Sequence, residues 1–160
     1  MLTVNNKYNA IGLSIEKTEA LIQALNDLLA NYSVFYMNIR GFHWNIKGAK
    51  FFELHLKFQE LYENLLLKID SIAERVLTLG GSPTHTYSDY LEETQIAEVS
   101  NVSDGRDAVV SILDGLRILL VKQREILALA EEDEGTAALM SDYIREQEKL
   151  VWMYSAFSQE

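Results

Sequence analysis

Residues 51–79 read FFELHLKFQELYENLLLKIDSIAERVLTL, and this stretch decides the fold. Its apolar residues return every three or four positions, which is the spacing of one buried face of an α-helix. This core stripe consists of Phe51, Phe58, Leu65, Ile69, Ile72 and Val76. Two glycines, Gly80 and Gly81, and then Ser82 and Pro83 follow, which is a typical signal for the end of a helix. The stretch therefore predicts one long amphipathic helix.

Four leucines of the same stretch lie outside the core stripe. They are Leu56, Leu66, Leu67 and Leu77. They share their flank with two acidic residues, Asp70 and Glu74. A helix that packs only within its own bundle keeps such a flank polar. The leucines therefore predict a second buried surface, which is a contact between subunits.

The remaining sequence predicts three more long helices and a short one. The first begins between Ser14 and Thr18 and ends near Trp44. The third runs from Ser103 to Glu131 with Ser103 or Asp104 as its N-cap, and the fourth begins after Gly135 with Thr136 as its N-cap. The links are short (45–50), long (82–102, with a short helix over 88–93) and short again. This order is typical of a ferritin-like four-helix bundle with one crossover. We expect an all-α fold in which residues 1–160 form a single domain.

Composition narrows the classes of function. The 160 residues are 48% hydrophobic, which is enough for one core, and no apolar run is long enough to cross a membrane. The N-terminal residues do not have the pattern of a secretory signal, and the absence of cysteine excludes disulfides and thiolate metal sites, so we expect a cytoplasmic protein. The formal net charge of −10 favours cations over nucleic acid as partners.

One flank of the long helix carries residues that can bind a metal ion. At about 100° per residue, His55, Gln59, Asp70 and Glu74 fall within one sector of about 100°. However, His55 and Asp70 are separated by roughly 22 Å along the helix axis, too far to hold one ion. Two copies packed antiparallel about a two-fold axis near residues 64 and 65 would bring the His55 end of each helix to the acidic end of the other. This geometry predicts a pair of metal sites shared between subunits.

The residue types also limit the metal. Imidazole and carboxylate ligands without sulfur suit iron, manganese or zinc. A cation would also offset the repulsion between Asp70 and Glu74, which are four residues apart. From the residues alone, a solvated acidic flank and histidines satisfied by packing remain open alternatives. The third histidine, His85, lacks such neighbours and is interpreted as a surface or capping residue.

Several motifs closely resemble those of the Dps family, the mini-ferritins named as DNA-binding proteins from starved cells. The motifs are GFHWNIKG (41–48), FFELH (51–55), IDSIAERVLTLGG (69–81) and KLVW (149–152). The resemblance covers nearly the whole chain. It implies a ferritin-like subunit, a hollow homododecamer and ferroxidase centres at the two-fold interfaces.

The resemblance also implies the roles of single residues. By position, His43 and His55 of one subunit and Asp70 and Glu74 of its partner are the iron ligands and the catalytic residues. Members of the family oxidise Fe(II), preferentially with hydrogen peroxide, and store ferric mineral in the cavity. This chemistry protects against oxidative stress.

The chain departs from the family at one ligand and leaves one feature open. Gln59 stands where the family carries Asp or Glu, and an amide cannot bridge two irons, so the second iron position is in doubt. The run of residues 131–134 aligns with the acids that line the family's three-fold pores. Glu131, Asp133 and Glu134 are therefore candidates for an iron-uptake pore, with an ordinary solvated loop as the alternative.

Two other functions remain open. The first is a nucleoid protein that compacts DNA, which the family name suggests. It is not favoured because twelve chains would carry a formal charge of about −120 and the sequence lacks a basic arm. The second is a cage whose ferroxidase activity is weakened by Gln59.

Overall fold

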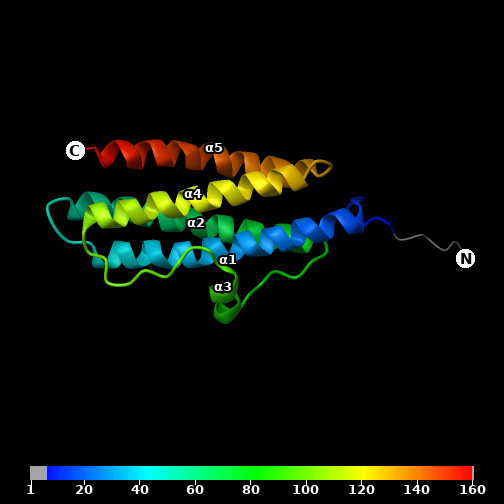
Figure 1. Cartoon of the computed structure of the whole chain (residues 1–160), viewed down its shortest axis with the longest axis horizontal. Helices are drawn as coiled ribbons and strands as arrows, with labels where there is room; N and C mark the ends of the chain where they lie inside the picture. Colours follow the sequence, from blue (N-terminus) through cyan, green and yellow to red (C-terminus); the bar gives the residue numbers. More distant parts are fainter. Residues whose placement is uncertain (1–6, 160) are drawn as a thin grey trace, which may run out of the picture.

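The computed structural model describes residues 7–159, which form five α-helices (Figure 1). These helices are α1 (Ile15–Asn45), α2 (Phe51–Thr78), α3 (Tyr87–Glu93), α4 (Gly105–Leu129) and α5 (Glu134–Phe157). The four long helices and the short helix within the crossover confirm the predicted all-α, ferritin-like architecture.

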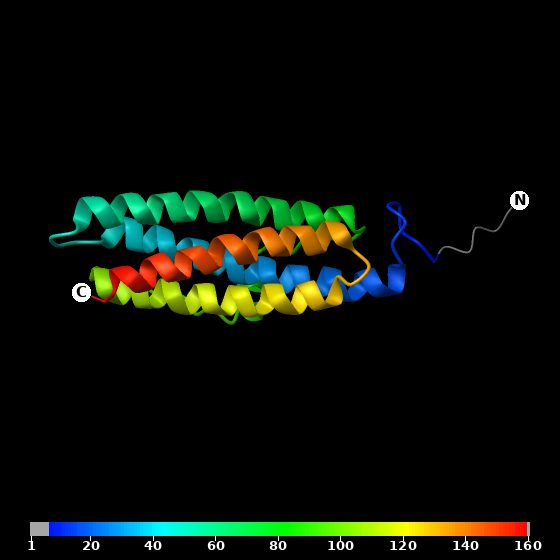
Figure 2. The same cartoon turned by 90° about the horizontal axis from the view of Figure 1, so that it is seen from above.

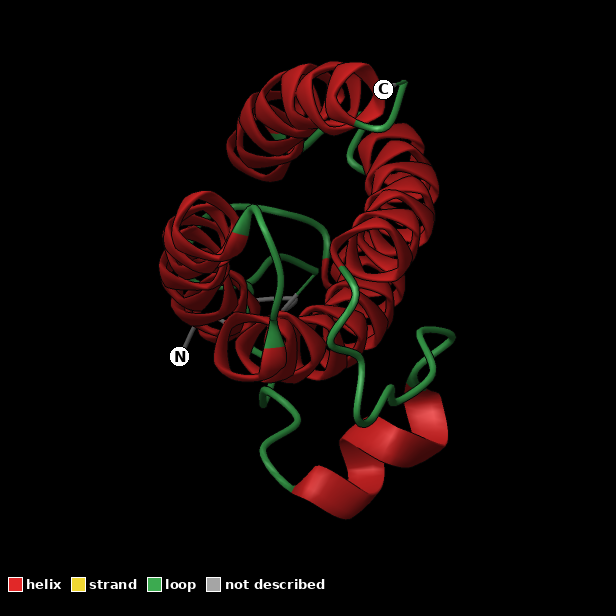
Figure 3. Ribbon diagram, turned by 90° about the vertical axis from the view of Figure 1, so that its left-hand side faces the viewer, coloured by secondary structure: helices red, strands yellow, loops and turns green. Residues whose placement is uncertain are grey.

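The long helices form two antiparallel hairpins that lie against each other. α1 pairs with α2, α4 pairs with α5, and the two hairpins meet where α1 packs on α4 (Figures 1 and 2). The crossover runs back along the bundle, with α3 against α1, so that α4 starts at the same end as α2 (Figure 1). The end-on view shows α3 outside the ring formed by the long helices (Figure 3).

Capping side chains explain where the last two long helices begin. The Asp104 carboxylate accepts hydrogen bonds from the backbone N–H groups of Arg106 and Asp107, which makes it the predicted N-cap of α4. The predicted start of α5 was wrong. Its N-cap is Asp133, whose carboxylate accepts a 3.0 Å hydrogen bond from the Thr136 N–H. Thr136 lies inside the helix, because Arg75 of α2 holds Asp133 in the capping position at 2.6 Å.

The core stripe of α2 is largely as predicted. Phe58, Leu65, Ile72 and Val76 are buried, whereas Phe51 and Ile69 are half-buried. Two further core residues, Leu54 and Leu61, were not predicted. The four flank leucines are exposed in the single chain, with Leu67 at 70%. α2 therefore presents a second apolar surface that its own bundle does not cover.

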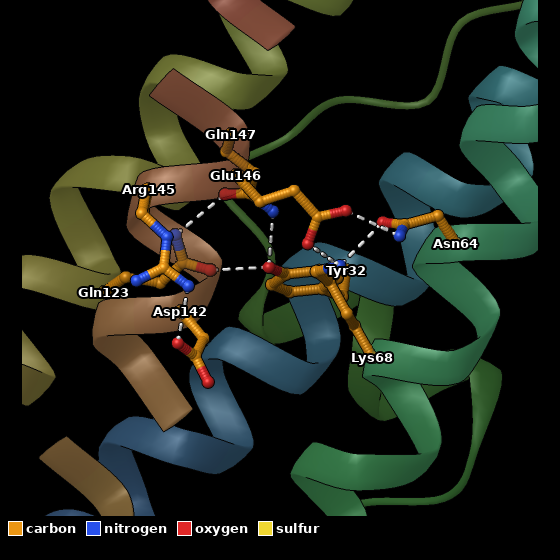
Figure 4. A network of polar contacts seen from close by, with 8 residues as sticks. All are labelled: Tyr32, Asn64, Lys68, Gln123, Asp142, Arg145, Glu146 and Gln147. Atoms are coloured by element: carbon orange, nitrogen blue, oxygen red, sulfur yellow. Dashed lines mark hydrogen bonds and ion pairs between the residues drawn. The ribbon is translucent and has the colours of Figure 1, made fainter. Parts of the chain in front are cut away.

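A ring of neutral polar groups fills the centre of the bundle (Figure 4). The Tyr32 hydroxyl of α1 donates to Gln123 of α4 at 2.5 Å and accepts from Gln147 of α5 at 2.6 Å. Gln123 in turn donates to Gln147 at 2.8 Å, which closes the ring. Beside it, Lys68 of α2 pairs with Glu146 of α5 at 2.6 Å. The centre of the bundle is therefore occupied by neutral side chains, and none of the candidate metal ligands belongs to this ring.

None of the helices in residues 7–159 is both long enough and apolar enough to cross a lipid bilayer.

Candidate metal centre

The hairpin between α1 and α2 brings two predicted ligands together. His43 lies in the last turn of α1 and His55 in the second turn of α2. Their imidazole rings stack with centroids 3.7 Å apart and planes inclined by 17°. His43 is buried, whereas His55 is half-buried and therefore reachable from outside the bundle.

The two histidines fix each other's tautomer through the backbone. Nδ1 of His43 lies 2.6 Å from the carbonyl oxygen of His55, and Nδ1 of His55 lies 2.7 Å from the carbonyl oxygen of His43. A carbonyl oxygen can only accept, so each Nδ1 carries a proton and donates it. In the neutral imidazole, Nε2 then has a free lone pair on both rings. This is the arrangement of a metal-binding histidine whose second nitrogen is anchored.

Aromatic residues and one cation surround the imidazoles. Phe51 stacks on His55 at 5.0 Å, and Tyr62 contacts His43 edge-on at 5.3 Å between ring centroids. The Arg40 guanidinium lies over the rings of Tyr62 and Trp44, at 5.7 Å and 4.6 Å. Sequence reasoning missed Tyr62 and Arg40. Their helical spacing, seven residues after His55 and three before His43, was the available signal.

The two predicted acidic ligands lie on the distant half of α2. Asp70 and Glu74 are both exposed in the single chain. A hydrogen bond with the Asp70 carboxyl, followed by the charge of that group, raises the pKa of Glu74. The pair thus resists carrying two negative charges, and a bound cation would relieve this repulsion.

Each chain consequently carries two incomplete sets of ligands rather than one complete set. Among residues 7–159, no group of three or more histidine and acidic side chains could hold a metal ion. The histidines and the acidic pair occupy separate positions along α2, and exposed leucines, including Leu66 and Leu67, lie between them. This arrangement agrees with the geometry predicted for a shared site. The assignment of all four ligands stays a prediction.

Gln59 and its acidic neighbours behave as ordinary helix-surface residues. The Gln59 amide donates to Glu63 at 2.9 Å, and Glu60 pairs with Lys57 at 2.8 Å. Both glutamates contact other side chains of the α2 surface rather than the histidines.

The acidic run between α4 and α5 divides into two kinds of residue. Asp133 is buried and held by Arg75 and Thr136, so within the chain its carboxylate is engaged in the α2–α5 contact. Glu131 and Glu134 are exposed, and Glu132 pairs with Lys17 at 2.5 Å. Glu131 and Glu134 remain candidates for a pore.

Comparisons with known proteins agree with this fold. Residues 22–160 match the family described as Ferritin-like domain. An uncharacterized protein of Haemophilus influenzae is 53% identical, covering 94% of this chain and 95% of its own. The DNA protection during starvation protein of Porphyromonas gingivalis is 41% identical, covering 92% and 94%.

The solved structures give the same result. The crystal structure of a Dps protein from Vibrio cholerae O1 is 58% identical, covers 94% of this chain and 96% of its own, and superposes with a TM-score of 0.93. That protein is described as a member of a broad superfamily of ferritin-like diiron-carboxylate proteins. The chain belongs to the Dps family of ferritin-like proteins.

Proposed function

We propose that this protein is an iron-oxidising and iron-storing mini-ferritin. Fe(II) binds at sites shared by two subunits, with His43 and His55 from one chain and Asp70 and Glu74 from the other. The observation that carries the proposal is the division of the ligands of residues 7–159 into two half-sites, one at the hairpin of α1 and α2 and the other on the distant half of α2, each incomplete by itself.

The half-sites complement each other chemically. The histidine half supplies two neutral Nε2 lone pairs, held by the Nδ1 contacts to backbone carbonyls. The acidic half supplies up to two negative charges, which balance the charge of one Fe(II). Neutral nitrogen and anionic oxygen donors together form a ligand set that iron favours.

Iron is the substrate of the proposed reaction and hydrogen peroxide is the oxidant. Two Fe(II) ions each give up one electron, the O–O bond of peroxide breaks, and two hydroxides form. When both electrons pass to the same peroxide molecule, hydroxide is the only product of the oxidant and no hydroxyl radical is left over. The Fe(III) product moves into the cavity of a homododecameric cage in the cytoplasm and is stored there as mineral, which protects the cell from oxidative stress.

The test compares Fe(II) oxidation by peroxide in wild-type protein and in Asp70→Ala and Glu74→Ala. We expect both variants to lose most of the rate at the shared sites, because each lacks a carboxylate ligand. Glu125→Ala removes an exposed carboxylate from α4 and should keep the wild-type rate. Wild-type rates in both ligand variants would end the proposal.

A further inference from the structure

Arg40 is the least satisfied charged group next to the candidate centre. Its guanidinium lies over three aromatic rings, at 5.6 Å from Tyr36, 4.6 Å from Trp44 and 5.7 Å from Tyr62. The guanidinium donates a long hydrogen bond of 3.4 Å from Nη1 to the Tyr36 hydroxyl, and its Nε is buried without a hydrogen-bond partner. Within residues 7–159, Arg40 makes no ion pair. The terminal nitrogens of the guanidinium therefore remain available to an anionic acceptor.

The surroundings of Arg40 indicate where that acceptor comes from. Arg40 lines a hollow of about 760 Å³ between α1, α2 and α3. Leu66 and Ile69 of α2 line the same hollow, and Leu66 is one of the exposed flank leucines. The hollow therefore opens on the face where a second copy of the chain would pack.

The register of that packing selects one acid. Arg40 lies one turn before His43 on α1 and contacts Tyr62, which is two turns beyond His55 on α2. A two-fold axis near residues 64 and 65 of α2 places Gln59 opposite Asp70 of the partner subunit. The same axis places Leu67 of the partner subunit opposite Tyr62, so Asp70 of the partner subunit lies within one helical turn of the level of Arg40, a gap that the arginine side chain can span.

Charge gives the reason for such a contact. Asp70 and Glu74 repel each other, and burial in an interface without a cation would add the cost of desolvation. Resting on the proposed function, we propose that Arg40 is the counter-charge of the metal-free site. Its guanidinium pairs with Asp70 of the partner subunit and holds the two subunits together before iron arrives. The planar guanidinium suits a carboxylate, to which it can donate two hydrogen bonds.

Glu98 is the competing acceptor within the chain, because it lines the same hollow. It is exposed, and it forms no ion pair with Arg40 in the described part of the chain. The experiment therefore includes a Glu98 variant as a matched control.

A double-mutant cycle tests the pair. Wild type, Arg40→Gln, Asp70→Asn and the double variant are diluted in EDTA buffer, and mass photometry measures the fraction of paired chains. Each single variant should weaken pairing about tenfold or more, and the double variant should be no weaker than either, because both remove the same contact. Two control variants should pair like wild type. They are Glu98→Gln and Arg117→Gln, and Arg117 is an exposed residue of α4.

A second measurement protects the test against misfolding. The chain has no cysteine, so Arg40→Cys with Asp70→Cys gives two defined, symmetry-related pairs of thiols per interface. A short bifunctional thiol reagent should link two chains in this variant, whereas Arg40→Cys with Glu125→Cys should not be linked.

The outcomes separate this inference from the proposed function. Additive effects in the cycle, normal pairing of Arg40→Gln, or wild-type pairing that needs added Co²⁺ would each overturn the role of Arg40 alone. Wild-type chains that pair neither in EDTA nor with Co²⁺ would overturn the shared site, and the role of Arg40 with it.

Discussion

The imidazoles of His43 and His55 are oriented by backbone contacts that no sequence pattern contains, and these contacts leave Nε2 of each ring free. Spacing indicated that His55 shares a flank with Asp70 and Glu74, and the family resemblance added His43. The tautomer of both rings depends on two backbone carbonyls that meet only when α1 folds back on α2. The residue types were therefore predictable, whereas their protonation and their stacking required tertiary structure.

At the residue scale, the proposed site predicts that Gln59 limits metal affinity. Gln59→Glu adds a carboxylate one turn from His55, and we expect Co²⁺ affinity to rise about tenfold because a charged oxygen replaces a neutral amide. Peroxide-driven Fe(II) oxidation should rise with it. The hydrogen bond between Gln59 and Glu63 is lost at the same time, so a small decrease in stability is also expected.

Gln95→Glu provides the control for Gln59→Glu. It adds the same charge to an exposed position in the crossover and should leave Co²⁺ affinity unchanged. Equal affinity in Gln59→Glu and wild type, by calorimetric titration, would show that residue 59 does not face the ion.

A buried ion pair connects elements that are far apart in the sequence. Arg75 of α2 contacts Asp133 at 2.6 Å and Thr136 at 2.8 Å, and so ties the end of α2 to the start of α5. The sequence indicated Thr136 as the N-cap because capping preferences depend only on neighbouring residues. They do not include the contact with Arg75, which is sixty-one residues from Thr136. The same contact explains why Asp133, though part of an acidic run, is not a surface acid.

Breaking this tie should destabilise the bundle. Asp133→Ala leaves Arg75 largely buried without its partner and also removes the cap, so we expect the free energy of unfolding to fall by about 3–5 kcal/mol. Asp133→Asn keeps a capping acceptor and should lose less. Urea denaturation with a chelator present measures both.

The matched control for the Asp133 variants is an exposed ion pair on the same helix. Asp142 pairs with Arg145 at 2.9 Å in solvent, so Asp142→Ala should cost less than about 1 kcal/mol. Equal losses in Asp133→Ala and Asp142→Ala would mean that the tie to α2 contributes nothing.

The whole molecule shows why one chain reveals its fold more readily than its site. Short, long and short links were enough to predict the bundle, because each connection constrains which helices are neighbours. Within residues 7–159, the ligands of the candidate site fall into two sets that one chain cannot join, and the exposed leucine surface of α2 is a local feature that favours a second subunit. The proposed site is therefore one that only a pair of chains could form.

Mixing two inactive variants tests this property directly. His43→Ala with His55→Ala removes one half-site, and Asp70→Ala with Glu74→Ala removes the other. In a mixed pair, the first chain still offers its acids and the second its histidines, so one of the two interface sites is complete. With equal amounts and random pairing after refolding together, about a quarter of all sites should regain Co²⁺ binding and Fe(II) oxidation. Each variant refolded alone should stay inactive, and a mixture as inactive as its parts would show that the ligands of one site come from a single chain.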